Sequence, residues 1–391
     1  MDKAATMNSF HTSYLEISKS ALQHNLRFLK ENIIPNAQIS SVVKGNAYGH
    51  GIELFVPLAE ECGISHFSVF SADEARRVYH AQTGNSSIMI MGMLGQDQLE
   101  WAIENDIEFY VFEQQRLEKA LEIAKKVGKQ AKLHVEVETG MNRTGFAIKK
   151  LPWVLQLLKQ NSDNLCFTGL CTHFAGAESI TNYYRIHKQQ QVFDKALKIV
   201  AASGIAPQKR HTACSAAALR YPKAQMDLVR LGIVQYGFFP TREVLIEYLT
   251  KKKTKDNPLQ RLLSWKSRVM DVKVVKTGEF IGYGTAYLAN NDKTIATIPV
   301  GYGDGFSRSM SNQGRVLIHG QRVSVIGTVN MSMITVDVTS LENVNIGDEV
   351  VLIGKQGDLE ISVASFSETS ELINYELLTR LPSEVPRYIV E

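Results

Sequence analysis

A lysine stands where the first strand-like run of the sequence ends. The stretch SSVVKGNAYGHG, residues 40–51, places Lys44 directly after an apolar segment and before a turn that contains three glycines. An ammonium group at the tip of a buried strand is costly unless it is exposed, paired or chemically employed. Nearby cations would lower the pKa of the amine from its ordinary value of about 10.4. Lys44 is therefore a candidate nucleophile toward carbonyl compounds.

Four further polar side chains follow other strand-like runs. They are Arg143 in VETGMNRTG, His173 at the end of FTGLCTH, Ser215 after KRHTAC and Arg230 within MDLVRLG. In a parallel α/β barrel, functional groups lie at the carboxyl ends of the strands. If these runs are the strands of one barrel, we expect the five side chains to meet at one mouth.

The arrangement of strands and helices predicts such a barrel. Helical spacing separates most of the β-type runs, as in ALQHNLRFLK and QRLEKALEIAKKVG, and eight alternating units are typical of a parallel (β/α)₈ barrel of the TIM type. A doubly wound open sheet is the competing fold, but it usually has fewer strands. The β-type runs are 39–44, 66–70, 87–91, 108–112, 133–137, 167–173, 209–214 and 226–232.

The sequence changes character after residue 245. A polar stretch, KKKTKDNP, precedes alternating β-branched runs broken by Gly, Asn and Asp, until a helical pattern begins at SVASFSETSELINYELLTRL. We therefore expect a barrel over residues 13–245 and a mainly β domain over residues 256–391, on which residues 1–12 could pack. The lysine run at 251–255 is interpreted as a solvated linker.

Composition excludes several classes of protein. The 43 basic and 40 acidic residues nearly cancel, which gives no basic face for nucleic acid. No apolar run reaches the length of a membrane span, and the first residues lack the apolar core of a signal peptide. The four cysteines form neither a metal-binding pattern nor a regular disulfide framework, so we expect no metal site and a cytoplasmic location.

The candidate residues allow a specific chemistry and also structural roles. A lysine among arginines suits imine formation with pyridoxal 5'-phosphate (PLP), and Ser215 with the amides near Gly232 and Ile233 could bind its phosphate. Alternatively, Lys44 is a surface lysine, and Ser215 is a helix N-cap before AAAL. Structural alternatives for Arg143 and His173 are a turn cap and a core position, respectively. Tyr283, in the segment GYGTAY, could be an ordinary sheet tyrosine.

Eight segments together resemble the ordered signatures of the PLP-dependent alanine racemase family. The resemblance runs from near residue 13 to near residue 388, in the family's order. The segments are VVKGNAYGHG, ETGMNRTGF, THFAGAE, HTACSAAALRYP, VRLGIVQYG, IGYGTAY, VGYGDGFSR and INYELLTRLPSEVPR. The family has a PLP-binding barrel followed by a β domain, in agreement with the fold that the pattern predicts.

The resemblance implies a role for each matching residue. Lys44 would hold PLP and act as one base, and Tyr283 from the partner subunit of a homodimer would act as the opposing base. Arg230 would face the pyridine nitrogen, and His173 would pack against the ring. Arg143 would contact the phenolic oxygen of PLP, and the backbone of Met331 would contact the substrate carboxylate. The phosphate would be bound by Tyr48, Ser215, Gly232, Ile233 and Tyr375.

The chain departs from the family pattern at a few positions. Glu136 stands where many members carry a lysine that is often carbamylated, and we expect it to pair with Arg143 in its place. Ser332 replaces a common aspartate beside Met331. The other departures are Asn330, Cys214 and Glu384.

The resemblance implies a racemase that interconverts L-alanine and D-alanine by a two-base mechanism and supplies D-alanine for cell-wall synthesis. Because Ser332 lies near the expected substrate contact, a racemase of serine or a larger amino acid is the alternative enzyme. A non-catalytic PLP-binding protein is the alternative from another class. A decarboxylase of the same fold matches the ordered segments less well.

Overall fold

The computed structural model describes residues 11–363, 365 and 374–391. Two compact units divide the chain. The barrel unit comprises Ala21–Ala47 and Ile52–Gln260, and the β unit comprises Met1–Ser20, Tyr48–Gly51 and Arg261–Glu391. Expectations for residues 1–10 lie outside the described residues. No helix among the described residues is long and apolar enough to cross a membrane.

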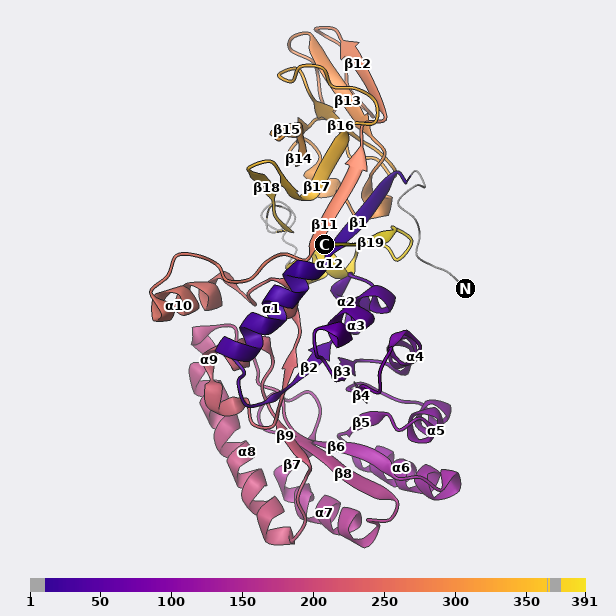
Figure 1. Cartoon of the computed structure of the whole chain (residues 1–391), viewed down its shortest axis with the longest axis vertical. Helices are drawn as coiled ribbons and strands as arrows, with labels where there is room; N and C mark the ends of the chain where they lie inside the picture. The colour runs from indigo at the N-terminus through magenta and orange to yellow at the C-terminus, as the bar shows by residue number, and fades with distance from the viewer. Residues whose placement is uncertain (1–10, 364, 366–373) are drawn as a thin grey trace. The chain divides into compact units, whose positions relative to one another are not determined.

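Eight parallel strands form the barrel unit, in the order β10-β2-β3-β4-β5-β6-β8-β9 (Figure 1). The ring closes because Asp227 N donates to Arg210 O at 3.0 Å and Arg230 N donates to Ala213 O at 3.0 Å, which joins β10 to the segment of β9. The expected (β/α)₈ barrel is thus confirmed. The strands are β2 (Gln38–Val42), β3 (His66–Val69), β4 (Ser87–Ile90), β5 (Glu108–Val111), β6 (Ala131–Glu138), β8 (Leu165–Cys171), β9 (Lys209–His211) and β10 (Leu228–Leu231).

Helices follow the strands in alternation, and Figure 1 shows α4 to α8 on the outside of the strands. Local signals set their ends: Glu113 caps α6 by accepting from two backbone amides, and Gly128, in the left-handed region, ends it. The helices are α1 (Lys19–Asn32), α3 (Ile52–Glu61), α4 (Ala72–Ala81), α5 (Gln96–Glu104), α6 (Gln114–Val127), α7 (Leu151–Gln160), α8 (Tyr183–Ser203), α9 (Ser215–Arg220) and α10 (Arg242–Lys252).

The lysine run at 251–255 is not a linker throughout. Lys251 and Lys252 belong to the last turn of α10, where cationic side chains complement the partial negative charge of a helix carboxyl end. Lys253 then ends the helix in the left-handed conformation, with φ of 53°.

A mainly antiparallel sheet forms the β unit, in the order β12-β13-β16-β15-β14-β17-β11-β1-β19, with β18 on β17. Strand β1 (Ser13–Ser18) pairs antiparallel with β11 and parallel with β19. The mainly β character expected of the second half of the chain is confirmed. The other strands are β11 (Leu263–Arg268), β12 (Asp271–Val275), β13 (Lys293–Ile298), β14 (Arg315–Ile318), β15 (Gln321–Val325), β16 (Ile334–Asp337), β17 (Glu349–Gln356), β18 (Leu359–Ile361) and β19 (Arg387–Val390).

Candidate active site

Seven of the residues singled out in the sequence belong to the barrel unit, at or beyond the carboxyl ends of its strands. Lys44 follows β2, Arg143 follows β6 and His173 follows β8. Arg230 lies within β10, and Gly232 and Ile233 come directly after that strand. Cys214 forms an isolated parallel bridge with Arg230, which places Ser215 beside it. The structure thus brings this group to one mouth.

The backbone after Lys44 is left-handed over five consecutive residues. The φ angles of Gly45, Asn46, Ala47, Tyr48 and Gly49 lie between 51° and 82°. Residues other than glycine adopt this conformation at a cost of roughly 1–2 kcal/mol each. Strain of this kind persists where the surrounding structure enforces it, and it clusters at functional sites.

Glu74, in the first turn of α4, holds this turn in place. Its carboxylate accepts from Gly45 N at 2.6 Å and from Phe70 N at 2.9 Å, and so ties the ends of β2 and β3 together. Glu74 is not among the residues singled out in the sequence. Its only signal was an acidic residue three positions after Ser71, the residue that caps α4.

Positive charge surrounds the amine of Lys44. The Lys44 side chain is exposed, but burial of the ammonium among neighbouring groups lowers its pKa, and the charge of Arg143 lowers it further. The Glu74 carboxylate acts in the opposite direction. A lowered pKa raises the fraction of unprotonated, nucleophilic amine at neutral pH.

Arg230 is buried, and among the described residues no carboxylate contacts it. Its guanidinium donates to Thr172 O at 3.0 Å, Thr212 O at 3.2 Å and His211 Nδ1 at 2.5 Å. These acceptors are uncharged, so the guanidinium is oriented without being neutralised by a direct ion pair.

His173 is neutral at the mouth. Burial lowers its pKa to about 3, and the charges of Arg230, Arg143 and Lys44 contribute to the shift. Its Nδ1 lies 3.4 Å from Arg230 Nη2, and its backbone carbonyl accepts from Gln189 Nε2 at 2.9 Å. The histidine is therefore held at the site without adding a charge.

Glu136 and Arg143 do not form the expected pair. Glu136 is buried and Arg143 is exposed, and within the described residues no ion pair joins them. Burial raises the pKa of Glu136, whereas a side-chain hydrogen bond from Thr144 and the charges of Arg143 and Arg230 lower it. The Arg143 turn is organised by Glu138, which accepts from the backbone amides of Gly140 and Arg143.

Ser215 is the first residue of α9 rather than its N-cap, a position that Cys214 occupies. The Ser215 hydroxyl oxygen accepts from Gly232 N at 2.9 Å, which leaves its own hydrogen able to donate. Ile233 begins the short 3₁₀ helix Ile233–Tyr236, whose first amides have no partner within the helix. A serine hydroxyl and helix-start amides are suitable donors for a phosphate group.

Two further sets of candidate residues belong to the β unit. The rings of Tyr48 and Tyr375 lie 6.0 Å apart between centroids, and Tyr375 lies on the helix α12 (Asn374–Thr379). Tyr283 and Met331 line a hollow of about 540 Å³, together with Asn330 and Ser332. Tyr283 is 74% exposed, so its side chain is available to a ligand or a second chain.

The fold and the grouping of residues agree with known proteins. A family model described as "Alanine racemase, N-terminal domain" matches residues 17–240, and one described as "Alanine racemase, C-terminal domain" matches residues 262–389. The chain belongs to the alanine racemase family. Two relatives named alanine racemase come from Leptospira interrogans and Carboxydothermus hydrogenoformans. They are 32% identical over 99% of this chain and 98% of the relative, and 35% identical over 96% and 99%.

Solved structures of the alanine racemase family have the same fold. The structure titled "Crystal structure of alanine racemase from D-cycloserine producing Streptomyces lavendulae" has a TM-score of 0.89 and 27% identity, and covers 98% of both chains. The expected family is thus confirmed, as is its class of enzyme. A serine racemase or a non-catalytic carrier protein is not favoured by these relatives.

The departures from the alanine racemase pattern lie in different places. Asn330 and Ser332 line the same hollow as Tyr283. Cys214 is a free thiol at the start of α9, and Glu384 accepts from its neighbour Ser383 at 2.9 Å. Among the described residues, no group of three His, Cys, Asp or Glu side chains could hold a metal ion.

Proposed function

We propose that this member of the alanine racemase family interconverts L-alanine and D-alanine with PLP held on Lys44. The residues present fit the cofactor. The mouth combines one amine of lowered pKa, the cations Arg143 and Arg230, and the neutral His173. Such an excess of positive charge suits an anionic ligand, and the Ser215 hydroxyl and Ile233 amide suit its phosphate.

PLP supplies an electron-withdrawing ring system that makes the α-proton of a bound amino acid removable. The protein has to move that proton from one face of the substrate to the other. Lys44 Nζ takes or gives it on one face, and Tyr283 Oη does so on the opposite face. Two bases avoid a rearrangement in which one group would have to cross the plane of the substrate.

Arg230 would set how strongly the PLP ring withdraws electrons from the substrate. A guanidinium stays protonated, so we propose that it donates to the pyridine nitrogen and leaves that nitrogen without a proton of its own. Withdrawal of electrons is then weaker, which disfavours side reactions such as transamination. Arg143 and the backbone of Met331 orient the phenolic oxygen of PLP and the substrate carboxylate, respectively.

The observation that carries the proposal is the place of Lys44 at the end of β2, where a left-handed turn held by Glu74 follows it and the charges of Arg143 and Arg230 act on its amine. A lysine with no function would need neither the left-handed turn nor the hydrogen bond from Gly45 N to Glu74 that holds the turn. The proposed function gives both features a purpose, because they keep Lys44 at one place beside the cofactor.

We propose that the enzyme is a cytoplasmic homodimer in which Tyr283 completes the site of the partner subunit. Exposure of the Tyr283 phenol in the single chain supports this arrangement. All four cysteines are free, which fits a reducing compartment. D-Alanine for cell-wall synthesis would be the product that the cell uses.

Racemisation of L-alanine by the purified protein tests the proposal directly. We expect activity with alanine and an absorption band of protein-bound PLP that is lost in Lys44→Ala. Serine, lysine and arginine are assayed side by side, because Ser332 lines the hollow beside Met331. Faster turnover of one of these would correct the substrate. PLP binding without α-proton exchange in deuterated water would contradict racemisation.

A further inference from the structure

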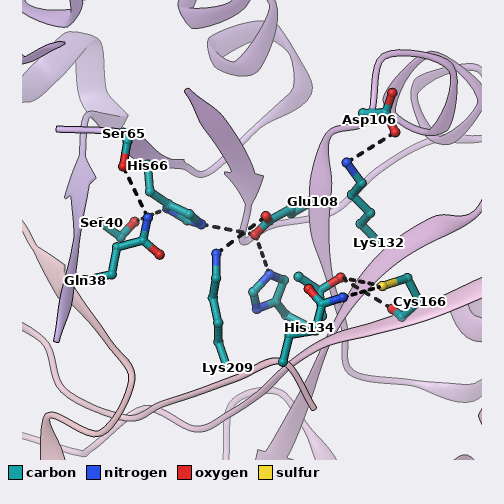
Figure 2. Close-up of polar contacts among 12 residues, drawn as sticks. Gln38, Ser40, Ser65, His66, Asp106, Glu108, Lys132, His134, Cys166 and Lys209 are labelled. Carbon is teal, nitrogen blue, oxygen red and sulfur yellow. Dashed lines mark hydrogen bonds and ion pairs between the residues drawn. The ribbon is translucent and has the colours of Figure 1, made fainter. Parts of the chain in front are cut away.

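A row of buried polar side chains crosses the interior of the barrel unit. Glu108 is the first residue of β5 and so lies at the amino end of that strand. Figure 2 shows His66, from β3, and His134, from β6, reaching the same Glu108 carboxylate. His211, the last residue of β9, and Arg230 continue the row toward the carboxyl end.

Short contacts join each member of the row to the next. Glu108 Oε2 lies 2.7 Å from His134 Nε2, and His134 Nδ1 lies 2.8 Å from His211 Nε2. His211 Nδ1 lies 2.5 Å from Arg230 Nη1. All four side chains are buried, so water does not compete for these contacts.

The chemistry of the groups fixes the direction of every hydrogen bond. Arg230 only donates, so His211 Nδ1 must accept and carries no proton. His211 then has its proton on Nε2 and donates to His134 Nδ1, which in turn accepts. His134 therefore has its proton on Nε2 and donates to Glu108, an ionised carboxylate that only accepts. One cation and one anion are thus linked through two neutral imidazoles.

Burial agrees with these protonation states. It lowers the pKa of both His134 and His211, which favours neutral rings. For Glu108 burial acts to raise the pKa, but hydrogen bonds from His134 and His66 bring it well below its ordinary value. His66 Nδ1 lies 2.8 Å from Ser40 Oγ, and Lys209 Nζ lies 3.9 Å from Glu108 Oε1 (Figure 2).

A glycine in β8 makes room for the row. A Cβ atom at Gly169 would lie 2.0 Å from His134 Nδ1, the atom that accepts from His211. Gly169 is not in a left-handed conformation, so the need for glycine here is one of space rather than of backbone angle. The missing side chain leaves a place for the His134 ring between β6 and β8.

We propose that Glu108, His134 and His211 act as a positioning relay that fixes the guanidinium of Arg230, so that a carboxylate at the amino end of the barrel strands serves the reaction at the mouth. The inference rests on the proposed function, in which Arg230 faces the cofactor ring. Satisfied core histidines are the simpler interpretation. The relay differs from that interpretation in one respect: it requires that His211 Nδ1 carries no proton and accepts from Arg230.

Histidine tautomers in the wild-type holoenzyme test the relay without reference to activity. In nitrogen NMR of protein labelled at histidine, we expect His134 and His211 to be neutral with the proton on Nε2. Because the chain of bonds transmits the charge of Glu108, we expect Glu108→Gln to shift the His211 Nδ1 resonance. A proton on His211 Nδ1, or an unchanged resonance in Glu108→Gln, would overturn the relay.

Two variants with matched controls measure its effect on the reaction. Glu108→Gln keeps a neutral acceptor, and Gly169→Ala displaces the His134 ring without removing a titratable group. Glu108→Gln weakens the hydrogen bond from His134, since hydrogen bonds to an ionised group are roughly twice as strong as neutral ones. Gly169→Ala moves the ring that donates this bond. We therefore expect each variant to lose about tenfold in kcat with little change in KM.

The controls are Glu60→Gln and Gly84→Ala. Glu60 accepts several hydrogen bonds, from Thr83, Gly84 and Ser86, away from the row. A Cβ atom at Gly84 would meet Glu60 Oε1 no closer than 3.5 Å. We expect both controls to keep wild-type turnover.

A conservative replacement separates the relay from packing alone. His134→Gln retains one donor and one acceptor, whereas His134→Leu retains neither, so Gln should restore part of the turnover that Leu loses. Equal turnover in the two variants would contradict the relay. A wild-type chain that does not racemise alanine would refute the proposed function instead, and the tautomers would still decide the relay.

Discussion

At the scale of single residues, the mouth of the barrel is a set of charges with few direct ion pairs. Lys44, Arg143 and Arg230 repel one another, and a buried carboxyl group on which these arginines act, that of Glu136, has a pKa raised by burial. Such an arrangement is unfavourable in the empty chain and favourable once an anionic ligand is bound. These residues therefore suit a site that holds an anionic ligand better than they stabilise the empty fold.

Glu136→Gln should separate the effect of the buried carboxyl group on the stability of the fold from its effect on turnover. Because burial raises the pKa of Glu136, its ionised form destabilises the fold, and this cost grows as the pH rises through the raised pKa. We expect the cofactor-free variant to melt at a higher temperature than the wild type at pH 7 and at the same temperature near pH 4. Turnover should fall about tenfold, because the carboxylate no longer offsets Arg143. An unchanged turnover and PLP affinity would show that Glu136 has no part in the site.

His173 should contribute to acid lability. Its pKa falls from 6.5 in the unfolded chain to about 3 on folding. Between these values the unfolded chain binds a proton that the folded chain does not, so the free energy of unfolding decreases as the pH falls. His134 and His211 add to the same trend.

Thermal melting of the cofactor-free chain between pH 4 and pH 7 measures this effect. We expect His173→Gln to lose stability with acid less steeply than the wild type, by up to one proton per molecule. Identical slopes would mean that His173 is protonated in the folded chain.

At the scale of elements, the eight strands of the barrel could be predicted because each is a short β-type run bounded by a helical pattern. The run 226–232, the least regular of them, is confirmed by β10. The left-handed turn after Lys44 could not be predicted, since Ala47 and Tyr48 have no preference for that conformation. The pairing of β1 with β11 could not be predicted from local sequence patterns either, because about 250 residues separate the two strands.

The backbone around Met331 packs closely against the backbone of Gly301. A Cβ atom at Gly301 would lie 2.2 Å from Asn330 O and 2.4 Å from Met331 O. Gly301→Ala should therefore displace the Met331 backbone, at a cost of about 1–3 kcal/mol in stability. We expect KM for alanine to rise about tenfold while the absorption of bound PLP is unchanged. Steady-state kinetics that match the wild type would exclude Met331 as a substrate contact.

At the scale of the whole molecule, the residues to which we assign the chemistry belong to two units. The barrel unit carries Lys44 and Arg230, and the β unit carries Tyr283 and Met331. The boundaries at 13–245 and 256–391 stay predictions, as does the homodimer. A single sequence shows which residues resemble family positions but not which chain supplies them to a given site.

Mixing two inactive variants tests whether a site is shared between subunits. Lys44→Ala and Tyr283→Phe each remove one base. In a mixed dimer, one of the two sites has both bases if Tyr283 comes from the partner. Random pairing should then restore about a quarter of the wild-type activity, because half of the dimers are mixed and each has one intact site. No recovery in a demonstrated mixed dimer would place both bases in one chain.

The most direct test of the central claim is α-proton exchange by Tyr283→Phe in deuterated water. If Lys44 and Tyr283 act on opposite faces, removal of the phenol should lower racemisation at least a hundredfold. Exchange of deuterium into one enantiomer of alanine should persist within about tenfold of the wild type, because Lys44 still serves that face. Equal loss of exchange into both enantiomers, or full exchange into both, would contradict the account.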